Sequence, residues 1–567
     1  MRKELSILML SSLLILPGCA KNESENYSGE TLVIYNVEDY ISNGDDDSVD
    51  LIAKFEEETG CSVKYYTYDT NETMYNQFKL QKEGTYDLVL GSEYMIQKMV
   101  KEGLCDKFED IEHNIPNYYN NCSPMLREKL NSMKVTVNGV EETLDSYALG
   151  YMWGTLGLIY DPNCSDTIND DIMSWSVLYN ETYKDKISIK NSMRDAFDVG
   201  LIYAYSQDAD YQVLLDAYLN NYSEETARAF NAKIQEVFDF KLDGSEESIA
   251  DNREKIARVK EALIALKQNI FGLETDSGKV DIIEGSKIYM DLAYSGDAVY
   301  SIQTAMDENE KELRYVVPLE GGNIWYDAWM LPKGSQHRDL AYKFLDFLCD
   351  SGNAASNSEY IGYTPFIIGE EMYTSIAGMY GATEFDINQE YSKDSYVYKD
   401  GQLYCVLEDE VSGEELTNEQ YFESLEYDPL VSYKEGDMVS YNGKFYNCVE
   451  DGSSIENFEE VEGYDLTHIY GGSLENRCCI VYPFYGLENQ LETQYPSEEI
   501  IYRCAIMNDF GEMNDEVIIM WGQFKAYTNM TPYYVILIVF LVIVIAVALY
   551  FVISKQRSAR FKRNKNK

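Results

Sequence analysis

Short apolar runs alternate with amphipathic segments through the first hundred residues of the chain. Thr31–Tyr35 and Tyr86–Leu90 are apolar enough to be buried strands, and Ser62–Tyr68 is rich in β-branched and aromatic residues. Segments 48–59 and 72–83 place apolar residues at helical spacing, and each is followed by a glycine that can end a helix. Strand, helix, strand, helix, strand is typical of a parallel, doubly wound sheet.

A doubly wound sheet binds its ligand beyond the carboxyl ends of its strands. The segments that follow the first and third predicted strands, 36–40 and 91–94, are therefore the first candidates for a binding site. The α/β pattern continues to about residue 348. Within it, the apolar segment 147–160 predicts a pair of strands that crosses between two lobes.

The sequence pattern changes after the α/β part. An Asp-Gly pair at 400–401 and an Asn-Gly pair at 442–443 are hairpin signals between aromatic-rich strands, and they predict an inserted β-rich module over 380–485. Segment 431–446 faintly resembles small chitin-binding modules, although it lacks the tryptophans that such modules stack on sugars. Sugar binding, docking and a spacer role all stay open for this module.

Both ends of the chain carry membrane-targeting signals. Residues 1–19 combine two basic residues, an apolar core and the sequence Leu-Pro-Gly-Cys, which predict a secretory signal. The last four residues resemble a bacterial lipoprotein cleavage site with Cys19 as the lipidated residue, although Pro17 departs from the small or β-branched residue that is usual there. Ordinary signal cleavage, with Cys19 incidental, is the alternative. Residues 533–553 carry no charge and are long enough to cross a bilayer as a helix. The tail 554–567 is basic, so we expect a cytoplasmic tail and a body held at the cell membrane on its extracytoplasmic face.

Charge and composition exclude several classes of function. The 567 residues include 98 acidic and 46 basic ones, for a formal net charge of −52, which opposes nucleic-acid binding and favours a cationic ligand. The 3 histidines, His113, His337 and His468, lie in ordinary polar contexts without a Ser-His-Asp arrangement. We therefore expect no catalytic residues, metal or cofactor. The 11 cysteines show no disulfide framework and are expected to be small core residues.

Several segments resemble the spermidine/putrescine-binding proteins of polyamine ABC importers, which are bacterial extracellular solute-binding proteins. The segments follow one another in the same order as in that family. The segments are 34–40, 55–60 (FEEETG), 68–75 (YDTNETMY), 86–103, 151–157 (YMWGTLG), 174–186, 320–332 (EGGNIWYDAWMLP), 361–365 and 495–525. The resemblance covers most of 31–375 and about 490–528. It implies an α/β, two-lobed, periplasmic-binding-protein-like (type II) fold that closes on its ligand by a hinge.

The resemblance also implies a division of the chain. We expect lobe 1 to comprise 31–148 and 326–375, and lobe 2 to comprise 149–325 and 486–528. The β-rich insert and the C-terminal transmembrane helix lie outside both lobes in this division.

Carried over residue by residue, the resemblance implies a ligand site of carboxylates, hydroxyls and aromatic rings. Its members are Asp39, Tyr40, Ser92, Tyr94, Asp195, Tyr294, Asp297, Trp325 and Asp327. A polyamine is an apolar rod with spaced ammonium groups, and separated carboxylates with aromatic faces between them are the groups that bind such a rod. Val37, Ser192 and Met507 replace side chains that the family often has, and together with Asp297 they point toward putrescine rather than spermidine.

The expected function is therefore a membrane-tethered polyamine-binding component of an ABC importer, whose partners are the permease and its ATPase. A sugar- or oligosaccharide-binding importer component is the main alternative, although sugar sites need amides more than several carboxylates. A sensor ectodomain lacks room for an output domain in the tail 554–567. A ferric-ion site could use Tyr65-Tyr66 or Tyr118-Tyr119, but these pairs lack a neighbouring histidine and acids.

Overall fold

The computed structural model describes residues 27–45, 48–274, 277–285, 287–461, 463–470, 479–480, 487–527, 540–547, 549–550 and 554–555. The predicted signal with Cys19, much of the apolar segment 533–553 and the basic tail beyond Lys555 lie outside these residues. Within the described ranges, no helix has the length and apolar character that a membrane crossing requires.

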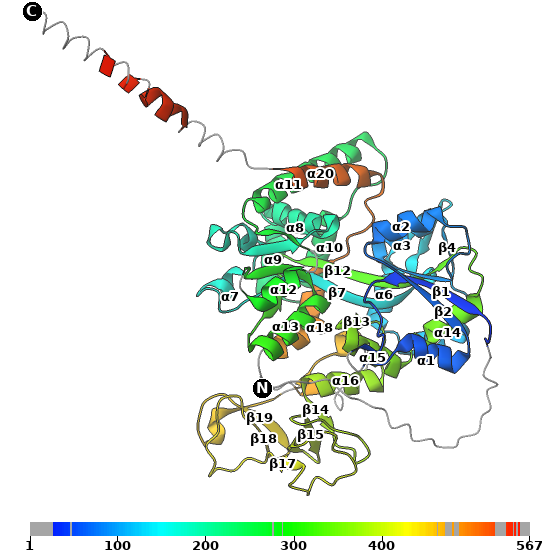
Figure 1. Ribbon diagram of the computed structural model, residues 1–567, viewed down its shortest axis with the longest axis vertical. Coiled ribbons are helices and arrows are strands. Elements are labelled where there is room, and N and C mark those ends of the chain that lie inside the picture. Colours follow the sequence, from blue (N-terminus) through cyan, green and yellow to red (C-terminus); the bar gives the residue numbers. More distant parts are fainter. Residues whose placement is uncertain are drawn as a thin grey trace, which may run out of the picture.

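A mixed β-sheet runs through the centre of the molecule (Figure 1). Its strand order is β2-β1-β3-β12-β7-β10-β8-β9, and short strands β4, β11, β13 and β23 pair with β7 or β12. The bounds are β1 (Thr31–Val37), β2 (Ser62–Tyr68), β3 (Leu88–Ser92), β4 (Cys105–Asp106), β7 (Ala148–Tyr160), β8 (Ile187–Lys190), β9 (Gly272–Glu274), β10 (Met290–Tyr294), β11 (Arg314–Val316), β12 (Gly322–Pro332), β13 (Thr364–Pro365) and β23 (Cys504–Ala505).

The predicted parallel arrangement is confirmed on both sides of the sheet. β1 pairs in parallel with β2 and with β3, and β10 pairs in parallel with β8. The two central strands differ, because β12 runs antiparallel to both β3 and β7. The sheet is therefore two parallel groups joined by an antiparallel pair.

The prediction of two strands over 147–160 is wrong, because β7 is one continuous strand that is buried along its whole length. Its glycines make room for neighbours instead of marking a turn. A Cβ on Gly150 would lie 2.0 Å from the ring of Phe366, and a Cβ on Gly154 would lie 2.7 Å from the ring of Trp325. Close packing against these rings explains glycines in the middle of a strand.

Helices pack around the sheet (Figure 1). Their bounds are α1 (Leu51–Thr59), α2 (Asn71–Leu80), α3 (Glu93–Lys101), α4 (Ile111–Asn114), α5 (Pro116–Asn121), α6 (Pro124–Ser132), α7 (Ile168–Asp171), α8 (Met193–Tyr205), α9 (Ala209–Asn220), α10 (Glu224–Phe238), α11 (Glu246–Lys267), α12 (Ser277–Glu284), α13 (Ser295–Asn309), α14 (Arg338–Leu348), α15 (Ser351–Ile361), α16 (Glu370–Tyr380), α17 (Thr467–Tyr470), α18 (Leu487–Gln494), α19 (Glu498–Tyr502) and α20 (Asn514–Ala526). Helix α1 shows the predicted end signals, since the Asp50 side chain accepts from Ala53 N and Gly60 ends the helix at φ 73°.

Two large hydrophobic cores lie along the sheet. One includes Trp153 of β7 and Trp329 of β12, together with β1 and β3. The other includes Leu158 of β7 and Phe197 of α8, together with β8 and β10. Strand β7 contributes to both cores, so it passes from one half of the molecule to the other. The exact lobe boundaries at 148/149 and 325/326 stay a prediction.

The insert folds into small sheets of its own. Its strands are β14 (Ala382–Glu384), β15 (Tyr396–Lys399), β16 (Gln402–Val406), β17 (Phe422–Ser424), β18 (Met438–Tyr441), β19 (Lys444–Cys448), β20 (Phe458–Glu460), β21 (Gly463–Tyr464) and β22 (Cys479–Ile480). A separate hairpin outside the insert pairs β5 (Lys134–Val137) with β6 (Val140–Thr143). The hairpin predictions are confirmed, because Asp400, Gly401, Asn442 and Gly443 all have positive φ between paired strands. Figure 1 places the insert and α20 on opposite sides of the α/β part.

Gly157 offers a test of how tightly β7 is packed. A Cβ at this position would lie 2.4 Å from the backbone oxygen of Val316 on β11. Because that oxygen cannot move without disturbing the β7–β11 pairing, we expect Gly157→Ala to lower the free energy of unfolding by roughly 1–3 kcal/mol in denaturant unfolding. Gly522→Ala on α20 is the matched control, since nothing lies within 4 Å of its Cβ. Equal losses in the two variants would contradict this packing.

A candidate site of carboxylates and aromatic rings

Asp327 is the meeting point of three segments that are far apart in the sequence. It lies on β12, directly opposite the end of β3. Ser92, the last residue of β3, donates from Oγ to Asp327 Oδ1 at 2.7 Å. Tyr40, which follows β1, donates from its hydroxyl to Asp327 Oδ2 at 2.9 Å. The structure thus brings these three predicted site residues together.

The Asp327 carboxyl is held in an unusual electrostatic state. Burial raises its pKa to about 6, although the hydrogen bonds from Ser92 and Tyr40 favour the ionised form and oppose the shift. The residue as a whole is half-buried. In the part of the chain that the structure describes, no lysine or arginine forms an ion pair with it. A cation that reached Asp327 would therefore find a carboxylate with unused acceptor positions.

The second group of predicted residues lies where β8 and β10 end. Because these strands run in parallel, the helices that follow them begin at the same edge of the sheet. Asp195 lies in the first turn of α8 and Asp297 in the first turn of α13, where the helix dipole favours a negative charge. Tyr294, at the end of β10, donates from its hydroxyl to Asp195 Oδ2 at 2.6 Å.

A row of four aromatic rings connects the two groups of carboxylates. The ring centroids of Tyr40 and Tyr363 are 5.5 Å apart, those of Tyr363 and Trp325 are 5.5 Å apart, and those of Trp325 and Tyr294 are 5.6 Å apart. All three contacts are edge-to-face. Gly296 allows this packing, because a Cβ there would lie 2.5 Å from the Tyr363 ring. Apolar ring surface thus lies between Asp327 and Asp195.

Asp297 differs from the other two acids, because it is already paired with cations. Lys190 Nζ lies 3.0 Å from Asp297 Oδ2, and Lys279 Nζ lies 3.1 Å from Oδ1. Burial alone would raise the pKa of Asp297, but the two lysines outweigh burial and hold the pKa below its usual value. The carboxylate is therefore ionised and neutralised from within the chain.

Tyr94 lies close enough to Tyr294 to interact with it electrostatically, but Tyr94 and Asp39 have their main contacts outside this cluster. The hydroxyl of Tyr94 donates to Glu72 Oε1 at 3.1 Å, and the guanidinium of Arg194 lies 3.7 Å from the centre of its ring. Asp39 lies in an exposed turn with φ 52° and interacts electrostatically with the hydroxyl of Tyr65. The roles of Tyr94 and Asp39 in ligand binding stay predictions.

Sequence reasoning missed four side chains at the site: Tyr363, Lys190, Lys279 and Arg194. Tyr363 lies in a segment that carries the family resemblance, but its ring was not assigned a role. Lys190 ends a predicted strand only five positions before Asp195, so its place at the strand end was a usable signal. Nothing local in the sequence indicates that its ammonium reaches Asp297.

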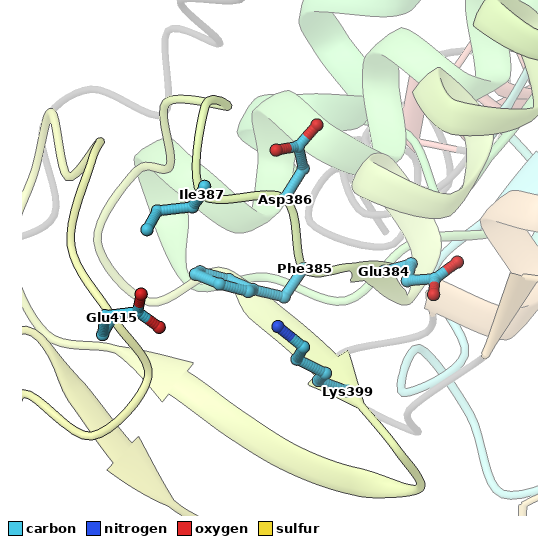
Figure 2. A pocket seen from close by; sticks show the side chains of 6 residues that line it. All are labelled: Glu384, Phe385, Asp386, Ile387, Lys399 and Glu415. Carbon is cyan, nitrogen blue, oxygen red and sulfur yellow. The ribbon is translucent and has the colours of Figure 1, made fainter.

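A shallow hollow in the insert lies on a surface separate from this cluster. Figure 2 shows the ring of Phe385 beside the side chain of Lys399, whose Nζ lies 5.3 Å from the ring centre, with acidic side chains around them. The acidic lining residues are Glu384, Asp386 and Glu415. All of these residues belong to the insert, so the hollow shares no residue with the cluster around Asp327.

Comparisons with known proteins find relatives of this chain. The sequence profile described as "Bacterial extracellular solute-binding protein" matches residues 50–370. The spermidine/putrescine-binding periplasmic protein of Salmonella typhimurium is 24% identical over 428 residues, which are 75% of this chain and 99% of that protein. The putrescine-binding periplasmic protein SpuD of Pseudomonas aeruginosa is 24% identical over 342 residues, which are 59% of this chain and 78% of SpuD.

A solved structure is also similar. The spermidine/putrescine ABC transporter substrate-binding protein PotD from Streptococcus pneumoniae shares 26% identity with this chain at a TM-score of 0.42. The match covers 60% of this chain and 87% of that one.

The raised pKa of Asp327 predicts a pH-dependent stability. The folded-state pKa of about 6 lies above the value of roughly 3.9 for an unfolded aspartate, so its stabilising contribution is full below about pH 4 and is lost as the pH rises through about 6. We expect Asp327→Asn to remove this dependence in denaturant unfolding measured across that range. Tyr40→Phe deletes a donor to the carboxylate and should move the loss to higher pH. A loss at lower pH would contradict the assignment.

Proposed function

The chain belongs to the bacterial extracellular solute-binding protein family, and from this premise we propose that it is the polyamine-binding component of an ABC importer. Family membership makes it a binding protein and not an enzyme. The names of its relatives, which bind spermidine and putrescine, support a polyamine as the ligand.

The observation that carries the proposal is a pair of acids without a cation at the two ends of an aromatic row. Asp195 is buried, with 5% of its surface exposed, and Asp327 is half-buried. Among the described residues, hydroxyl groups are their hydrogen-bond donors and no lysine or arginine forms an ion pair with either. A buried carboxylate without a counter-charge is costly, so a ligand that brings two ammonium groups completes the site.

The rings between the two acids suit the rest of such a ligand. A diamine has a methylene chain between its ammonium groups, and that chain loses unfavourable contact with water against Tyr363 and Trp325. The ring faces also attract the ammonium groups themselves. A sugar could stack on the same rings, but it would leave the charges of Asp195 and Asp327 unpaired.

Contacts between the two halves of the molecule support closure around the ligand. Gln97 on α3 donates from Nε2 to Asn508 Oδ1 at 2.8 Å and accepts from Asp509 N at 3.0 Å. Arg194 on α8 stacks on Tyr94 of α3. We infer that these contacts join lobe 1 to lobe 2 in the closed form, with β7 and β12 as the hinge between them.

Membrane tethering is part of the proposal and rests on the sequence. We propose that 533–553 crosses the membrane, that the body stays on the extracytoplasmic side, and that Cys19 carries a lipid. The family is extracellular, which agrees with this side of the membrane. A tethered receptor meets its permease at a higher effective concentration than a freely diffusing one.

Calorimetric titration tests the ligand class. We expect heat from putrescine and no heat from oligosaccharides, because only the amine supplies counter-charges. Asp327→Asn and Asp195→Asn should each weaken diamine binding by about 100-fold, since each leaves a buried ammonium without its carboxylate. Asp216→Asn, at an exposed position on α9, is the control and should bind like the parent protein. Binding of an oligosaccharide in place of amines would overturn the proposal.

The same titration has a predicted pH dependence. The amine binds the ionised form of Asp327, so a proton competes once the pH falls below the pKa of about 6. We expect the affinity for putrescine to fall by about tenfold per pH unit below that point. An affinity that stays constant between about pH 7 and pH 5 would show that Asp327 does not contact the amine.

A further inference from the structure

The ammonium group of Lys190 lies against an acid and an aromatic ring of the predicted site. Its Nζ lies 3.0 Å from Asp297 Oδ2 and 4.1 Å from the centre of the Tyr294 ring. A carboxylate and an aromatic face are the two groups that recognise a ligand ammonium. Tyr294 and Asp297 are both predicted to contact the ligand, and both contact Lys190 in this structure.

The backbone of Lys190 is firmly held. Lys190 ends β8, and its register partner is Glu274 on β9, the next strand of the sheet. On the other side β8 pairs with β10, the strand that carries Tyr294. The side chain is 17% exposed. It therefore reaches Asp297 from a fixed position and not from a flexible loop.

The electrostatic surroundings of Lys190 favour its charged form. Burial opposes the charge, but Asp297, Asp195 and Asp291 outweigh burial and raise the pKa of Lys190. Lys190 thus also weakens the negative potential at Asp195, although its hydrogen bond goes to Asp297. Lys279, whose side chain is more exposed at 31%, binds the other oxygen of Asp297.

We propose that the ammonium of Lys190 takes the place of one ligand ammonium group at Asp297 and thereby restricts the ligand to a diamine. The inference rests on the proposed function and adds which class of polyamine the site selects. Asp327 and Asp195 meet the two ends of a diamine such as putrescine. A triamine such as spermidine brings a third ammonium, for which Asp297 is the remaining acid, and Lys190 both occupies that acid and repels the incoming charge.

Removing the charge of Lys190 should open the third position. We expect Lys190→Met, which keeps an unbranched apolar stem, to raise the affinity for spermidine relative to putrescine by about tenfold or more in calorimetry. Asp297 Oδ2 and the Tyr294 face become free, while Lys279 stays on Oδ1. The double variant Lys190→Met/Asp297→Asn should lose this gain, because the acid that binds the third ammonium is gone.

Lys287→Met is the matched control. Lys287 precedes β10, at the opposite edge of the sheet from Lys190, and it pairs with Asp281 and not with Asp297. Its variant removes the same charge and should leave the ratio of the two affinities unchanged. Thermal unfolding of each variant checks that it is folded before its affinities are compared.

Two results would overturn the inference. A parent protein that prefers spermidine would show that Lys190 does not select by charge number. So would an affinity ratio that stays unchanged in Lys190→Met, including the case of an equal gain for both amines. These results leave polyamine binding itself intact. If neither the parent nor the variant binds any polyamine, the proposed function fails as well, so the two failures are distinguishable.

Discussion

The antiparallel pairing of β7 with β12 is the constraint on which the rest of the structure depends. Strand β7 passes from one hydrophobic core to the other, and β12 pairs with it on the side of the first core. Because β12 also pairs with β3 and β7 also pairs with β10, the two strands hold the two parallel groups in one sheet. Side chains alternate along a strand, and Trp325 and Asp327 therefore share one face of β12. The register shift between Asp327 and Ala328 falls at this site, where such an irregularity can redirect a side chain.

The second constraint is electrostatic, and the three acids of the cluster meet it in different ways. Asp327 keeps two hydroxyl donors and a raised pKa, so it can lose its charge when no cation is present. Asp195 keeps one hydroxyl donor, from Tyr294. Asp297 is neutralised by two lysines. The net charge of −52 attracts any cation from a distance, so selectivity must come from which of these acids is left without a partner.

Local signals predicted the elements well, and long-range contacts were the part that sequence could not supply. The bounds of β2 and the turns at Asp400 and Asn442 follow from residues adjacent in the chain. Strand β7 was mispredicted as two strands because its glycines face partners such as Phe366, which no local pattern reveals. The family resemblance led to Ser92 and Asp327, which are 235 residues apart. It could not indicate that Lys190 pairs with Asp297, because that contact depends on this chain's own side chain at the end of β8.

Asp195 and Asp297 have similar positions in the fold but different cation partners. Each acid lies in the first turn of a helix that follows one of two parallel strands, so the backbone and the helix dipole favour a carboxylate equally at both. The fold therefore places two acids at one edge of the sheet, but it does not determine how many of them bind a ligand. On our proposal, the residue at the end of the neighbouring strand determines that number. A lysine there binds Oδ2 of one acid, and a neutral residue would leave that oxygen for the ligand while Lys279 stays on Oδ1. A single strand-end position would then set the number of ammonium groups that the site accepts.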